Sequence, residues 1–411
     1  MSPSAVISPV QHLGAIAIVS PLVLAYAIAF IDPSNILERA SIFLLSVARA
    51  GQLQYSAPVF TGNSTYDGIF MSLVWVFHMH AFDLVLRKAV YLGEVTARKS
   101  AQSGLQRTYT AWCLLFNWRN INTPWTEKDP EPSRERLGYD PSNGVFVTRR
   151  VAYIILLYLA LDAMFSFLLA PNVENDIPEH KEAISPRIEA GTLRIIARVL
   201  PAILPTILPA FSLYGMFTIP YNIASIIAVL WGGGKPKNWP QQLGSFLGGY
   251  SFRRYWRRCR RATWHRFLRS TLETLISYIT THVLFVPPTW EIFSRCVRLF
   301  LAFYVTALVH PPSAVVFGES AFALDVPKFF FMQAVGIVTD DTLLYGMAVA
   351  GRGATDNVTA KRTAKLWGYI WVIAWTAWTG PTSTWIIKRK LVPGKDDVLP
   401  WSVVKWLGYR N

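Results

Sequence analysis

The apolar stretch Leu299-Phe-Leu-Ala-Phe-Tyr-Val-Thr-Ala-Leu-Val-His310 contains eleven uncharged residues and ends in a histidine. Such stretches recur along the chain, and each approaches the roughly 20 residues that an α-helix needs to cross a bilayer. The clearest lie at residues 13–31, 68–87, 150–170, 297–318, 329–350 and 366–387. The region 192–232 is long enough for two spans, and 41–60 is a weaker candidate that Arg49 and Gln52 interrupt.

The overall composition agrees with a membrane protein. The chain has 411 residues, of which 52% are hydrophobic and 16% charged, and its mean hydropathy is +0.29. A soluble domain usually has about a quarter charged residues. Because backbone groups in lipid must be paired within their own segment, the spans should be helical. We therefore predict an all-α, polytopic integral membrane protein with about seven to nine transmembrane helices, forming one domain over residues 1–411.

The positive charge is concentrated rather than spread evenly. The net charge is +15, and no acidic residue occurs from Ala190 through Leu272, whereas eight arginines fall between residues 253 and 269. In a protein with several spans, basic residues collect in cytoplasmic loops and contact lipid headgroups. The charge therefore does not indicate a nucleic-acid partner. Of the two long hydrophilic stretches, 92–149 and 233–270, the second is expected on the cytosolic side.

The basic stretch from Phe252 to Phe267 has the pattern of an amphipathic helix. Its apolar positions recur every three or four residues, at Phe252, Trp256, Cys259, Thr263 and Phe267, and arginines occupy much of the rest. Arginine side chains match the geometry of phosphate oxygens. The pattern predicts an interfacial helix whose arginines can hold a polyanion.

His310 is the strongest candidate for a general base. It follows an uncharged stretch, and a neutral imidazole can accept a proton from a hydroxyl near neutral pH. The structural alternative is a histidine that only bonds a neighbouring helix. His78, His80 and Asp83 form a second polar group, but side chains two residues apart point to opposite sides of a helix, so we expect no metal there. The pair Asp340-Asp341 has no second acidic cluster to support magnesium–diphosphate chemistry.

Four segments in this order resemble the wax-synthase-like branch of the membrane-bound O-acyltransferases. Arg119-Asn-Ile-Asn-Thr-Pro-Trp125 is similar to the family's Arg-Gly-Ile-Gly-Thr-Pro-Trp, and Ser251-Phe-Arg-Arg-Tyr-Trp256 with Trp264-His265 is similar to its Ser-Leu-Arg-Asp-Phe-Trp-Gly-Arg-X-Trp-His block. Thr306 to His310 resembles the segment with the catalytic histidine, and Phe329 to Asp341 resembles the Phe-Phe…Gln…Glu-Asp stretch. The resemblance covers about residues 119–341.

The chain departs from the family pattern at several positions. Asn120 and Asn122 replace the two glycines, Arg254 replaces an acidic residue, and four extra residues separate Trp256 from Trp264. These departures affect the expected binding of the acyl donor and the fit of the acceptor substrate more than the assignment to the class of acyltransferases. They leave open an inactive member of the family.

The resemblance implies transfer of an acyl group, with acetyl expected first, from acyl-CoA to a hydroxyl of a lipophilic secondary metabolite such as a terpenoid. His310 is then the catalytic base and His265 polarises the reacting groups. The residues that the resemblance implies for binding of the acyl-CoA donor are Arg253, Arg254, Arg257, Arg258, Arg261, Trp256, Trp264 and Arg119. No metal and no bound cofactor are expected, acetyl-CoA being a co-substrate. The expected location is the endoplasmic reticulum membrane, among lipids.

Three alternatives stay open at this point. A wax-ester or sterol acyltransferase would use long acyl chains in the same fold. A membrane prenyltransferase or terpene cyclase would need acidic clusters, for which only Asp340-Asp341 is available. A transporter would use His78, His80 and Asp83 as a polar path through the membrane.

Overall fold

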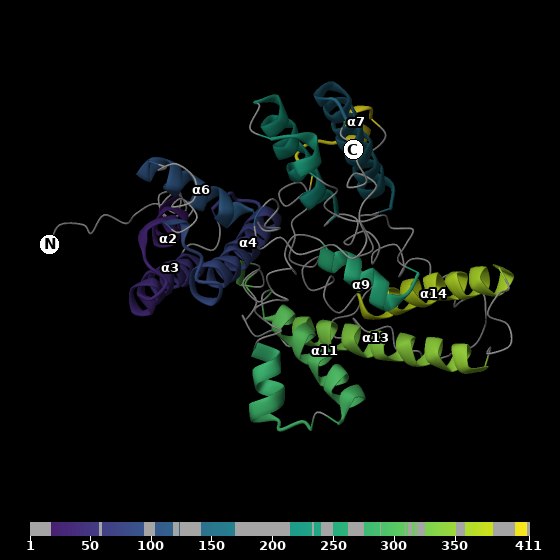
Figure 1. Ribbon diagram of the computed structural model, residues 1–411. Helices are drawn as coiled ribbons and strands as arrows, with labels where there is room; N and C mark the ends of the chain where they lie inside the picture. Colours follow the sequence, from purple (N-terminus) through teal and green to yellow (C-terminus); the bar gives the residue numbers. More distant parts are fainter. Residues whose placement is uncertain are drawn as a thin grey trace. The chain divides into compact units, whose positions relative to one another are not determined.

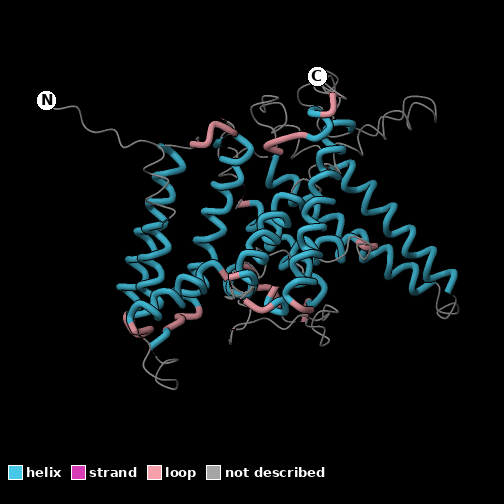
Figure 2. Tube along the Cα trace, turned by 90° about the horizontal axis from the view of Figure 1, so that it is seen from above, coloured by secondary structure: helices cyan, strands magenta, loops and turns pink. Residues whose placement is uncertain are grey.

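In the residues that it describes, the computed structural model consists of helices joined by turns and loops. It describes residues 18–56, 60–93, 103–117, 123, 141–168, 214–231, 234–239, 250–261, 275–287, 289–308, 310, 315–316, 318, 325–350, 358–380 and 399–408. Within these ranges there is no strand, as the tube in Figure 2 makes visible. The all-α prediction is confirmed for these residues.

The chain divides into two compact units. The first comprises Met1–Thr126, Thr263–Pro327 and Leu391–Asp397, and the second comprises Glu127–Ala262, Lys328–Lys390 and Val398–Asn411. The prediction of one domain over residues 1–411 stays a prediction.

The first unit is built around four helices that precede residue 117 (Figure 1). They are α2 (Ser20–Phe30), α3 (Ile36–Ser56), α4 (Ser64–Phe82) with its π-helical extension η2 (Asp83–Arg87), and α6 (Gly104–Phe116). Their core buries aliphatic side chains of α2, α4, η2 and α6. Further along the chain, the same unit contains η6 (Ile279–Val283) and α11 (Glu291–Ala307), and Ile276 packs against Val76 of α4.

A buried arginine holds these helices together. The side chain of Arg39 in α3 is 1% exposed. Its guanidinium donates to the carbonyl oxygens of Ala27 and Ile31 at 3.2 and 3.3 Å, and to those of Val85 and Val90 at 2.8 and 2.6 Å. These carbonyls lie in or just beyond the last turns of α2 and η2, where most carbonyls have no intrahelical N–H partner; that of Ala27 also accepts the N–H of Ile31 at 3.3 Å. Arg39 therefore caps two helix ends from a third helix.

The second unit contains the helices that follow residue 127. They are α7 (Asn143–Leu168), the helix Tyr214–Leu230, η4 (Pro236–Asn238), α9 (Phe252–Arg261), α13 (Asp325–Ala350, from Lys328 onward), α14 (Val358–Thr379) and α16 (Val403–Trp406). Buried Arg150 of α7 donates to the side chain of Asn222 and to the carbonyl of Trp239. Buried Gln333 of α13 donates to the Thr379 hydroxyl of α14 at 3.0 Å. These contacts tie α7 to the helix Tyr214–Leu230 and α13 to α14.

Two helices of the described ranges are long and apolar enough to cross a membrane. They are Ser64–Arg87 and Asn143–Ser166, each with a mean hydropathy of 1.7. Two shorter apolar helices are Ser20–Phe30 and Tyr214–Leu230. The larger count of about seven to nine crossings stays a prediction.

Candidate active site

His310 lies immediately beyond the end of α11. The helix ends at Ala307, and the backbone N–H of His310 donates to the Ala307 carbonyl at 3.2 Å. The Thr306 hydroxyl donates to the Ala302 carbonyl one turn earlier, at 2.8 Å. His310 is half-buried. The predicted base therefore stands at a helix end, with a short turn fixing its backbone.

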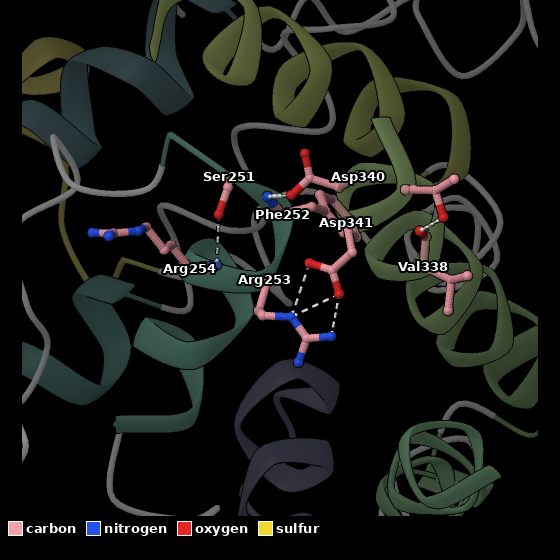
Figure 3. A network of polar contacts seen from close by, with 8 residues as sticks. Ser251, Phe252, Arg253, Arg254, Val338, Asp340 and Asp341 are labelled. Atoms are coloured by element: carbon pink, nitrogen blue, oxygen red, sulfur yellow. Dashed lines mark hydrogen bonds and ion pairs between the residues drawn. The ribbon is translucent and has the colours of Figure 1, made fainter. Parts of the chain in front are cut away.

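The helix α9 begins where the basic stretch was predicted to begin. Ser251 caps it, because its hydroxyl accepts the backbone N–H of Arg254 at 3.2 Å. The backbone N–H of Phe252, the first residue of the helix, donates to a carboxylate oxygen of Asp340 in α13 at 2.8 Å (Figure 3). The first turn of a helix has unpaired N–H groups and a partial positive charge, so both acceptors stabilise it. Asp340 is 4% exposed and thus serves as a second, distant cap.

Arg253 pairs with the carboxylate next to this cap. Its Nε lies 3.0 and 2.9 Å from the two carboxylate oxygens of Asp341, and its Nη2 reaches the second oxygen (Figure 3). A guanidinium that bonds a carboxylate through two nitrogens is fixed in orientation, and its charge is neutralised. The pair gives Arg253, predicted to bind the acyl-CoA donor, a structural contact with α13. Both carboxylates of the Asp340-Asp341 pair are engaged by α9, which weakens the case for magnesium–diphosphate chemistry there.

The apolar side of α9 packs against protein. Phe252 is fully buried and lies edge-on to Trp375 of α14, with ring centroids 6.3 Å apart. One turn later, Trp256 packs against Phe329 and Phe330 at the start of α13, at 6.5 and 6.1 Å. The amphipathic prediction is confirmed for Phe252 and Trp256. The ribbon of α9 accordingly lies beside α13 and α14 (Figure 1).

Tyr250, just before α9, meets two basic side chains. The guanidinium carbon of Arg254 lies 4.5 Å from the centre of the Tyr250 ring, and the ammonium of Lys365 in α14 lies 5.4 Å from it. The backbone of Tyr250 packs directly onto Gly368, where no side chain intervenes. Lys365 was not among the predicted site residues; its signal in the sequence is the basic run Lys361-Arg-Thr-Ala-Lys365 just before the apolar stretch 366–387.

Several predicted site residues have no described side chain. Arg119, Trp264 and His265 lie outside the described residues, and Arg257, Arg258 and Arg261 lie in α9 with side chains outside them. For His310 and His265, the catalytic roles stay predictions, as does donor binding for the arginines and tryptophans.

The side chains of His78 and His80 in α4 contact different neighbouring helices. The His78 ring bonds the Ser46 hydroxyl of α3 at 2.9 Å, whereas the His80 ring bonds the Leu114 carbonyl of α6 at 3.3 Å. The prediction that the two histidines point to opposite sides is confirmed. Asp83 pairs with two basic side chains nearby, Arg87 and Lys88. In the described residues, no group of three or more His, Cys, Asp or Glu side chains could hold a metal.

Comparison with known proteins gives the class to which these features correspond. The model of the membrane bound O-acyl transferase family matches residues 239–332, which include α9, α11 and His310. This match confirms the resemblance predicted from the motifs. By this similarity the chain is an acyltransferase enzyme.

Curated relatives extend the similarity over most of the chain. An acetyltransferase, TRI7 of Fusarium sporotrichioides, is 24% identical and the alignment covers 90% of this chain and 88% of the relative. Acetyltransferase atnC of an Arthrinium species is 25% identical, with 79% of this chain and 72% of the relative covered. Acetyltransferase aurG of Calcarisporium arbuscula is 24% identical over 77% of this chain and 75% of its own length. The relatives are thus fungal acetyltransferases.

Proposed function

We propose that the protein is an integral membrane acetyltransferase that moves acetyl from acetyl-CoA to a hydroxyl of a lipophilic secondary metabolite, of which a terpenoid alcohol is the first candidate. The observation that supports this most strongly is that the acetyltransferases align with it over most of both chains. The endoplasmic reticulum membrane is the proposed location.

The proposed reaction is a direct transfer without an acyl-enzyme. His310 accepts the proton of the acceptor hydroxyl while its oxygen attacks the thioester carbonyl. The new C–O bond forms and the C–S bond breaks, so that the proton ends on the thiol of coenzyme A. His265 donates a hydrogen bond to the carbonyl oxygen as negative charge develops there.

The position of His310 suits this role. A residue just beyond a helix end has its backbone fixed by the last turn, as the bond from His310 to Ala307 does here. A half-buried imidazole can meet a substrate hydroxyl while staying largely away from bulk water. The carboxylates that a prenyltransferase would need for magnesium are held by α9 instead.

The test uses membranes that contain the full chain, incubated with labelled acetyl-CoA and a panel of terpenoid and other lipophilic alcohols. Mass spectrometry should detect an acetyl ester, and His310→Ala should lower turnover at least about a hundredfold at equal protein level. His282→Ala is the matched control, because His282 is an exposed histidine of the same unit. Labelled palmitoyl-CoA tests the long-chain alternative. Equal turnover in the two variants would refute the role of His310.

A further inference from the structure

The two basic side chains beside Tyr250, Arg254 and Lys365, differ from Arg253 in their ion pairing. Arg253 has its charge balanced by Asp341. Arg254 and Lys365 are both exposed, and within the described ranges neither forms an ion pair with a carboxylate. Both charges instead lie within 5.4 Å of the centre of one aromatic ring.

Two positive charges gathered on one ring repel each other, and the face of the ring offsets only part of that repulsion. An anion bound near both of them would relieve it. The sequence supplies no acidic residue nearby from the side of α9, since none occurs from Ala190 through Leu272. A phosphate group of a ligand is an anion that such a pair of basic side chains can bind.

The backbone fixes this arrangement rather than leaving it to flexible side chains. Tyr250 packs onto Gly368 of α14, three residues after Lys365, and its ring also meets Tyr369 at a centroid distance of 6.3 Å. On the other side, the Ser251 cap and the Asp340 contact set the start of α9, which presents Arg254. The two cations thus come from two helices that are locked together at this point.

We infer that Arg254 and Lys365, positioned by Tyr250, form a phosphate-binding site that holds phosphate groups of the acyl-CoA donor. This rests on the proposed function and adds Lys365 and Tyr250 to the donor site. It also separates the arginines at the start of α9, because Arg253 anchors the helix to α13 whereas Arg254 faces the ligand. Phosphate on an anionic lipid headgroup has the same chemistry, and the experiment separates the two sources.

The experiment measures equilibrium binding of labelled acetyl-CoA to the full chain in nanodiscs of phosphatidylcholine alone. Lys365→Gln and Arg254→Gln should each weaken binding about five- to tenfold, because each removes a charge-assisted hydrogen bond. Lys237→Gln is the matched control; it removes the same charge from an exposed position in the same unit and should stay within about twofold of the wild type.

Tyr250 is tested as a positioning residue by a pair of variants. Tyr250→Phe keeps the ring and should retain wild-type affinity, whereas Tyr250→Leu removes the aromatic face and should weaken binding in the same direction as Lys365→Gln. Unchanged melting temperatures would show that the weaker binding is not unfolding. Equal affinities of the phenylalanine and leucine variants would overturn the positioning role.

The outcomes distinguish this inference from the proposed function. If the wild type binds and transfers acetyl while Lys365→Gln and Arg254→Gln bind as tightly as the control, the phosphate site is wrong and the function stands. If those variants instead retain less phosphatidylserine after purification from mixed nanodiscs, with unchanged acetyl-CoA affinity, the site belongs to a lipid headgroup and the inference is overturned. A wild type that binds no acetyl-CoA would refute the proposed function itself.

Discussion

Replacing Gly368 with alanine should force α14 away from the start of α9. An alanine Cβ at this position would overlap the carbonyl oxygen of Tyr250 and lie 2.9 Å from its carbonyl carbon. Both are backbone atoms, so no side-chain rotation can relieve the overlap. Overpacking of this kind costs about 1–3 kcal/mol, and the better helix propensity of alanine offsets about 0.5–1 kcal/mol of it. We expect a net loss of up to about 2.5 kcal/mol, and a difference of about 1–3 kcal/mol from an alanine variant that gains the same propensity without the overlap.

Denaturant unfolding of the purified protein would measure this loss, with Gly346→Ala as the control. Gly346 also lies in a helix of the second unit, but an added Cβ there meets no heavy atom within 4 Å. Gly346→Ala should therefore be as stable as the wild type or slightly more stable. Gly368→Ala should also bind acetyl-CoA more weakly, because Tyr250 is displaced. Equal stability of the two alanine variants would refute the close approach of Tyr250 to Gly368.

Two further predictions concern the polar contacts. Asp340→Ala should lower the free energy of unfolding by about 1–3 kcal/mol, because it leaves the buried N–H of Phe252 unpaired. Asp341→Ala should lower it by at most about 1 kcal/mol, because the ion pair with Arg253 is partly exposed. Equal losses of the two variants in denaturant unfolding would contradict this order. Arg39→Lys should cost about 2 kcal/mol or more, since a single ammonium cannot serve four carbonyls. Arg49→Lys, at an exposed position of the same helix, should change stability by less than about 0.5 kcal/mol in the same measurement.

Hydropathy predicted the helices that are apolar along their whole length. The predicted spans 68–87, 150–170 and 329–350 correspond to α4 with η2, α7 and α13, with ends shifted by a few residues. The helix α6 falls instead within the hydrophilic stretch 92–149, where no helix was predicted. Its signal was local, because Ser103 and Gln106 form a reciprocal capping box at its start. Apolar periodicity alone does not detect a helix of this kind.

The partners of the basic side chains could not be predicted from the sequence. Arg253 and Asp341 are 88 residues apart, and Arg39 reaches carbonyls up to 51 residues away. Composition and spacing show that a guanidinium needs acceptors, but not which distant helix end supplies them. The arginines of α9 therefore looked alike in the sequence, and only the structure separates Arg253 from Arg254.

The dependence of α9 on α13 also sets an order of events during biosynthesis. Ser251 caps α9 locally, but its second cap, Asp340, and the counter-charge of Arg253, Asp341, follow their partners by 88 positions. At roughly 5–20 residues per second, the ribosome needs about 4–18 seconds to add them. During that interval α9, with six arginines in ten residues, lacks these contacts, and in the proposed membrane protein we expect it to stay at the membrane surface. Variants that weaken the later contacts should therefore lower the yield of correctly inserted protein as well as its stability.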